Sequence, residues 1–114
     1  MTRLLFFIIL SLFPIQYVMA SSDSQADRYV REAQYYQKKA ESYRKEAAYH
    51  LKKAESYQRE AAYYTKKGKT ETAKGYLRKA EREMDSYKTQ LNYAAKAEDK
   101  AADYLKRASN LLKN

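Results

Sequence analysis

Alanine and tyrosine recur at a fixed spacing along residues 26–64. Alanine stands at every seventh position, and a tyrosine or histidine follows three residues later, which gives the pairs Ala26/Tyr29, Ala33/Tyr36, Ala40/Tyr43, Ala47/His50, Ala54/Tyr57 and Ala61/Tyr64. Six repeats of seven place both sets of residues on one stripe of an α-helix, as in a coiled coil. The spacing predicts a helix over about residues 23–67.

A second apolar pattern, with alternating steps of three and four residues, runs from Leu77 towards the C-terminus. It comprises Leu77, Ala80, Met84, Tyr87, Leu91, Ala94, Ala101, Leu105, Ala108 and Leu112, and Glu98 interrupts it. Gly68 suits the left-handed conformation that ends many helices, and Thr70 suits the start of the next helix. The pattern predicts a turn at about residues 68–70 and a helix over about residues 70–113.

Two helices of nearly equal length joined by a short turn favour an all-α chain, a long antiparallel helical hairpin of the coiled-coil type. We expect the Ala/Tyr stripe of the first helix to pack on the Leu/Ala stripe of the second. One long helix that dimerises through the same stripe is the alternative. The residues expected in the packing seam are Ala33, Tyr36, Ala40, Tyr43, Ala47, Ala54, Tyr57, Ala61, Tyr64, Leu77, Ala80, Met84, Tyr87, Leu91 and Leu105.

The residues around the turn also have a recognisable spacing, formed by Tyr57, Ala61, Tyr64, Gly68, Ala73, Leu77 and Ala80. This spacing resembles one tetratricopeptide repeat, about 34 residues in which small and aromatic side chains join a helix pair. The chain has no second copy and lacks a proline near Asp85. The resemblance implies a helix–turn–helix at this point and no binding function.

The first twenty residues differ in composition from all the others. Arg3 precedes an apolar run from Leu4 to Phe13, and small residues lead up to Ala20. This pattern predicts a secretory signal peptide over residues 1–20, cleaved between Ala20 and Ser21, and therefore a secreted, extracellular protein. An uncleaved signal anchor is the alternative.

Residues 21–114 have no Phe, Trp, Ile, Pro or Cys, and they retain twelve of the thirteen tyrosines. Their 22 basic and 14 acidic side chains give a formal charge of +8. So few aliphatic side chains do not build a compact core, and no disulfide compensates for them. We therefore expect order to come from helix propensity and a narrow seam.

Three tyrosine–lysine groups lie off the predicted seam at intervals of fourteen residues. They are Tyr35 with Lys38 and Lys39, Tyr49 with Lys52 and Lys53, and Tyr63 with Lys66 and Lys67. Fourteen residues make two heptads, so the groups fall on nearly the same side of the helix at intervals of about 21 Å. Either the lysine stems cover the rings, or the tyrosines and amines serve contact or crosslinking.

The sequence predicts no catalytic residues, no cofactor and no metal site. His50 is the only histidine, and one imidazole does not make a metal site. Carboxylates such as Glu81, Glu83, Asp99 and Asp103 stand among lysines, where we expect solvent exposure. Interleaved charges of both signs argue against a nucleic-acid groove, whereas a basic exported protein suits an acidic polysaccharide or a mineral surface.

These features favour a secreted, non-enzymatic structural protein of an extracellular matrix, whose partners are further copies of itself, other matrix proteins or acidic polymers. In composition the chain resembles Tyr/Lys-rich proteins of adhesives and of shell or cuticle matrices, which implies oxidation of tyrosine to catechol or dityrosine. The alternative is a cationic amphipathic protein that acts on membranes, as antimicrobial proteins do. A third hypothesis is a peptide precursor cut at the double lysines.

Overall fold

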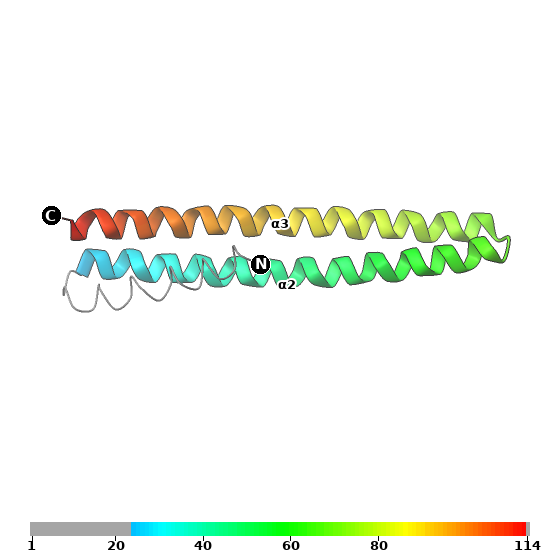
Figure 1. The fold of residues 1–114 in the computed structure, drawn as a ribbon, viewed down its shortest axis with the longest axis horizontal. Helices are drawn as coiled ribbons and strands as arrows, with labels where there is room; N and C mark the ends of the chain where they lie inside the picture. The colour runs from blue at the N-terminus through cyan, green and yellow to red at the C-terminus, as the bar shows by residue number, and fades with distance from the viewer. Residues whose placement is uncertain (1–23, 114) are drawn as a thin grey trace. The chain divides into compact units, whose positions relative to one another are not determined.

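A computed structural model describes residues 24–113 of the chain. It contains two antiparallel α-helices, α2 (Ser24–Lys66) and α3 (Thr70–Leu112), joined by a short turn (Figure 1). The all-α antiparallel hairpin is thereby confirmed, and the alternative of one continuous helix is wrong for this chain. The predicted signal peptide and the Ala20–Ser21 cleavage site lie outside the described residues.

The chain divides into two compact units, and each contains one segment of α2 and one of α3. Within the described residues, unit 1 comprises residues 24–40 and 96–113, and unit 2 comprises residues 41–95 with the turn. In each unit the two segments run in opposite directions.

The turn between the helices depends on Gly68, whose φ of 75° lies in the left-handed region. The Lys69 amide donates to the Tyr64 carbonyl at 2.9 Å, which is the backbone closure that typically accompanies a left-handed glycine at a helix end. The Ala73 amide then donates to the Lys69 carbonyl at 3.0 Å, at the start of α3. The last carbonyls of α2, those of Tyr63, Tyr64 and Thr65, are thus paired within the turn.

Rows of buried alanines form the centre of both helices. In α2 the row is Ala26, Ala33, Ala40, Ala47, Ala54 and Ala61, and in α3 it is Ala73, Ala80, Ala94, Ala101 and Ala108, with half-buried Tyr87 at the intervening seventh position. All eleven alanines are at most 4% exposed. Because a methyl group occupies so little space, alanine facing alanine allows a close approach of the two backbones.

The larger side chains lie on either flank of these rows. On α2, the tyrosines and His50 follow each alanine by three residues and are half-buried. On α3, Tyr76 and Glu83 also stand three residues after an alanine, whereas Leu77 and Met84 stand four after. At about 100° per residue, these two positions fall on opposite sides of the row. We call them the tyrosine side and the leucine side.

The alanines of the predicted α3 stripe are buried, but the expected burial of its leucines is wrong for unit 2. In unit 2 the tyrosine side of α2 meets Tyr76, Glu83 and Tyr93 of α3, not the leucines. Leu77 and Leu91, both expected in the seam, are 47% and 39% exposed. Two closely spaced alanine rows leave no room for leucine between them, so the leucines lie at the edge.

The aliphatic residues of unit 1 are better covered than those of unit 2. Ala26, Val30 and Ala108 form a small buried cluster, and Tyr29, Leu105 and Leu112 pack against it. Val30 stands four residues after Ala26, on the same flank as the leucines of α3. Val30 of α2 therefore helps to cover Leu105 and Leu112. The equivalent leucines of unit 2, Leu77 and Leu91, remain exposed.

Candidate functional site

The three predicted tyrosine–lysine groups do present their rings to solvent. Tyr35, Tyr49 and Tyr63 are 52%, 55% and 51% exposed, although a lysine ammonium lies over each ring. The ammonium belongs to the fourth residue after the tyrosine, and the distances to the ring centroid are 5.2 Å for Lys39, 5.3 Å for Lys53 and 5.2 Å for Lys67. About half of each phenol is thus accessible beside a fixed positive charge.

Each exposed tyrosine also touches the aromatic residue that follows it. The ring centroids lie 5.2 Å apart for Tyr35 and Tyr36, 5.4 Å for Tyr49 and His50, and 5.1 Å for Tyr63 and Tyr64, all edge to face. Edge-to-face packing is a favoured aromatic geometry. It holds the exposed ring against a half-buried one, so each group has a defined orientation.

Two of these half-buried rings belong to tyrosine stacks between the helices. In unit 2, Tyr76 of α3 lies between Tyr57 and Tyr64 of α2, with centroid distances of 6.1 and 5.5 Å. The planes of Tyr64 and Tyr76 differ by 3°. The Lys79 ammonium lies 5.2 Å from the Tyr76 centroid. Sequence reasoning placed Tyr57 and Tyr64 in the seam but missed Tyr76.

Unit 1 contains a stack of the same form. Tyr104 of α3 lies between Tyr29 and Tyr36 of α2, at 6.0 and 5.8 Å, and its plane is within 10° of that of Tyr36. The Arg107 guanidinium lies 5.3 Å from the Tyr104 centroid, and the Lys100 ammonium 5.2 Å from that of Tyr36. The two stacks are related by a shift of 28 residues on each helix, in opposite directions.

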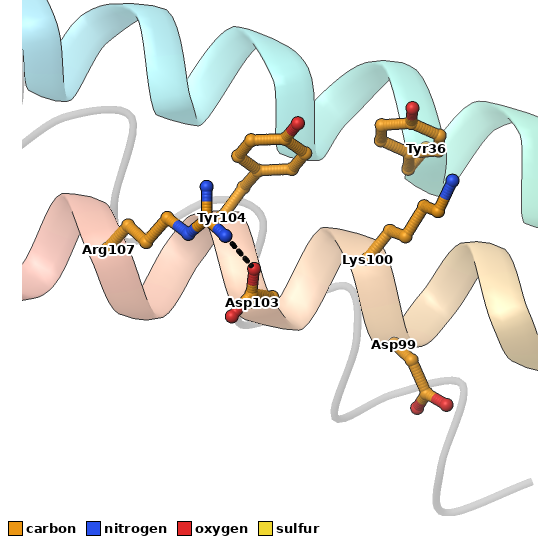
Figure 2. Close-up of a pocket in the computed structure, with 6 residues that line it drawn as sticks. All are labelled: Tyr36, Asp99, Lys100, Asp103, Tyr104 and Arg107. Carbon is orange, nitrogen blue, oxygen red and sulfur yellow. Dashed lines mark ion pairs between the residues drawn. The ribbon is translucent and has the colours of Figure 1, made fainter.

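A surface pocket of about 320 Å³ opens beside the unit 1 stack (Figure 2). Its lining residues are Tyr36, Asp99, Lys100, Asp103, Tyr104 and Arg107. Arg107 is paired with Asp103 at 3.0 Å, while Lys100 extends towards Tyr36 and Asp99 points away from the rings. Both signs of charge alternate along this wall, which does not favour a simple anion site.

A polar cluster replaces the stack at His50. The His50 Nδ1 donates to Glu83 Oε2 at 2.5 Å across the two helices, and the Lys53 ammonium lies 3.3 Å from Glu83 Oε1. The side chain of Glu83 is 16% exposed, so its predicted place on a solvated face is wrong. The pairing was missed because Glu83 occupies the α3 position that holds Tyr76 one heptad earlier.

The cluster changes the ionisation of its carboxyl and amine. The hydrogen bond from His50 lowers the pKa of Glu83, burial opposes this effect, and Lys53 adds to the lowering. The hydrogen bond and charge of Glu83 in turn raise the pKa of Lys53. Lys53 therefore links the exposed Tyr49 ring to a carboxylate held between the helices.

Within residues 24–113, no group of three or more His, Cys, Asp or Glu side chains is arranged to hold a metal ion. In the same residues, neither helix is long and apolar enough to span a membrane. No known protein family, curated protein or solved structure matches the chain.

Proposed function

We propose that this protein is a secreted, non-enzymatic structural protein of an extracellular matrix, and that α2 binds an acidic polysaccharide or a mineral surface. The observation that carries the proposal is the set of exposed rings of Tyr35, Tyr49 and Tyr63, each with a lysine ammonium held over it. The cation over each ring offers an acidic polymer a charge, and the phenol hydroxyl of the same group offers a hydrogen bond.

The spacing of these groups supports a repeating partner. Within unit 2, Tyr49 and Tyr63 stand fourteen residues apart and each follows a buried alanine by two residues, so both lie on the side of α2 turned away from α3. Several weak contacts at a constant interval reinforce one another on a partner with many anionic groups. A small ligand would gain nothing from such an arrangement.

Binding to immobilised heparin, used as an acidic polysaccharide probe, tests the proposal. The first variant changes four exposed lysines of the groups to glutamine, namely Lys38, Lys39, Lys66 and Lys67. The matched control changes four exposed lysines elsewhere, namely Lys74, Lys96, Lys106 and Lys113. Both variants lose the same net charge. If overall charge alone governed binding, both would therefore elute at the same lowered salt concentration.

The proposal predicts that the group variant elutes at distinctly lower salt than the control variant. A separate variant changes Tyr35, Tyr49 and Tyr63 to alanine and keeps the net charge. It should also elute at a lower salt concentration than the unaltered protein. Equal elution of the two lysine variants, together with an unaffected tyrosine variant, would contradict a dedicated binding face.

Tyrosine oxidation is the second part of the proposal. With peroxidase and hydrogen peroxide, two phenols each lose one electron and one proton, their ortho carbons join, and the peroxide is reduced to two waters. We expect dityrosine to map first to Tyr35, Tyr49 and Tyr63, because half of each ring is open. Preferential modification of the half-buried stack residues Tyr76 and Tyr104 would contradict this part.

A further inference from the structure

The leucine side of α3 in unit 2 exposes a row of apolar side chains with a period of seven. Leu77 and Leu91 are 47% and 39% exposed, and half-buried Met84 stands midway between them. A groove of about 410 Å³ runs beside Leu77 and Met84, with Gln58 of α2 on its far wall. Apolar residues with this period are what one helix buries against another.

Three exposed charged residues line this groove, namely Glu81, Asp85 and Lys88. Glu81 and Lys88 each stand four residues after one apolar residue of the row and three before the next, so both lie on the same flank of the row. When two copies of the row meet antiparallel with Met84 opposite Met84, Glu81 of one copy lies within one residue of Lys88 of the other along the helix axis. The acid and the base are therefore complementary between antiparallel copies.

We propose that unit 2 binds a second copy of this chain through the leucine side of α3. The two α3 segments run antiparallel, and a two-fold axis passes beside Met84. Leu77 then packs against Leu91 of the partner subunit, and Glu81 pairs with Lys88 of the partner subunit. Each contact occurs twice, as in any two-fold interface.

Charge selects this orientation over a parallel one. In a parallel pairing in register, the two copies of Glu81 lie on opposite flanks of the contact, and so do the two copies of Lys88, so Glu81 does not meet Lys88. The antiparallel arrangement instead brings Glu81 beside Lys88 of the partner subunit on both flanks.

This contact is independent of the proposed polymer binding. Tyr49 and Tyr63 follow the alanine row by two residues, which places them about 200° around α2 from it. Pairing through the leucine side of α3 leaves these rings accessible. A dimer that does not bind heparin, or a heparin-binding monomer, would separate the two proposals.

Sedimentation velocity over a range of protein concentrations measures the association. We expect a reversible dimer, and we expect Leu77→Lys with Leu91→Lys to weaken dimerisation at least tenfold. The matched control is Tyr49→Lys with Tyr63→Lys, which changes two residues on α2 that have the same spacing and are somewhat more exposed. The control should dimerise like the unaltered protein. A protein that stays monomeric at hundreds of micromolar overturns the proposal.

Cysteine pairing tests the register without depending on the charged variants. The chain contains no cysteine, so each introduced thiol is unique. Under mild oxidation, Met84→Cys should form a disulfide with its own copy. Leu77→Cys mixed with Leu91→Cys should give mostly the mixed dimer. Preferential pairing of Leu77→Cys with itself would show a parallel contact and overturn the two-fold arrangement.

Discussion

Glu83 is the residue through which acidity affects this fold. Its carboxylate accepts a hydrogen bond from His50 and forms an ion pair with Lys53, and both interactions lower the pKa of Glu83. A lowered pKa means that the native state binds its proton less readily than the unfolded chain does. The stabilisation is therefore complete above about pH 4.3, the ordinary pKa of glutamate, and is lost as pH falls through the lower native pKa.

We predict that Glu83→Gln lowers the free energy of unfolding at pH 7 by about 1 kcal/mol. The difference between the variant and the unaltered protein should shrink as pH falls from 7 to 3, because Glu83 gains a proton first in the unfolded chain and then, as pH passes its lowered pKa, in the native state. Urea unfolding followed by circular dichroism at pH 7 and pH 3 measures both effects. Glu60→Gln, which changes an exposed carboxylate of α2, is the control. A difference that does not depend on pH would contradict the role of the ionised carboxylate.

At the scale of the elements, the alanine rows determine how closely α2 and α3 approach. Ala54 is 0% exposed, whereas Ala48 on the same helix faces solvent. A leucine in a close alanine contact forces the backbones apart, and such overpacking costs about 1–3 kcal/mol. We predict that Ala54→Leu lowers the free energy of unfolding by this amount, and that Ala48→Leu changes it by less than about 0.5 kcal/mol.

Thermal unfolding of the two leucine variants distinguishes this packing from an ordinary leucine seam. In such a seam, Ala54→Leu would add buried apolar surface and raise the melting temperature. A stabilised Ala54→Leu variant would therefore contradict the alanine contact.

The two glycines have opposite roles in these elements. Gly68 has a φ of 75°, which a residue with a side chain adopts only with strain, whereas Gly75 lies inside α3 with open space around it. We predict that Gly68→Ala destabilises the protein by about 1 kcal/mol and that Gly75→Ala stabilises it by a similar amount. Chemical denaturation of the two variants measures both changes, and the same sign for both would be inconsistent with the turn described.

The sequence predicted the helices well because a strict heptad and a glycine stop are local signals. The buried alanines Ala80, Ala94, Ala101 and Ala108 belong to the predicted stripe of α3, but the prediction also placed Leu77 and Leu91 in the seam, where two close alanine rows leave no space for them. The spacing of seven that relates these alanines to Ala73 distinguishes the inner row from the leucines. The partner contacts, such as Tyr76 with Tyr64 and Glu83 with His50, depend on the register between helices, which no local pattern contains.

At the scale of the whole chain, the helix pair separates two kinds of surface. The alanine rows are internal, the tyrosine side closes one edge with ring stacks, and in unit 2 the leucine side of α3 stays open. The exposed tyrosine–lysine groups of unit 2 lie on α2, away from the leucine side of α3. The proposed polymer binding and the proposed pairing of copies therefore use different faces, which suits a protein that assembles.

In this fold, α2 and α3 of one chain pack alanine against alanine in antiparallel register. The ring stacks place Tyr57 and Tyr64 around Tyr76, and this register puts Ala54 opposite Ala80. The most direct measurement is disulfide formation in dilute protein carrying Ala54→Cys and Ala80→Cys. We predict rapid closure within a single chain and none for Ala54→Cys with Ala94→Cys. Disulfides that join different chains, or equal closure of both pairs, would contradict the account.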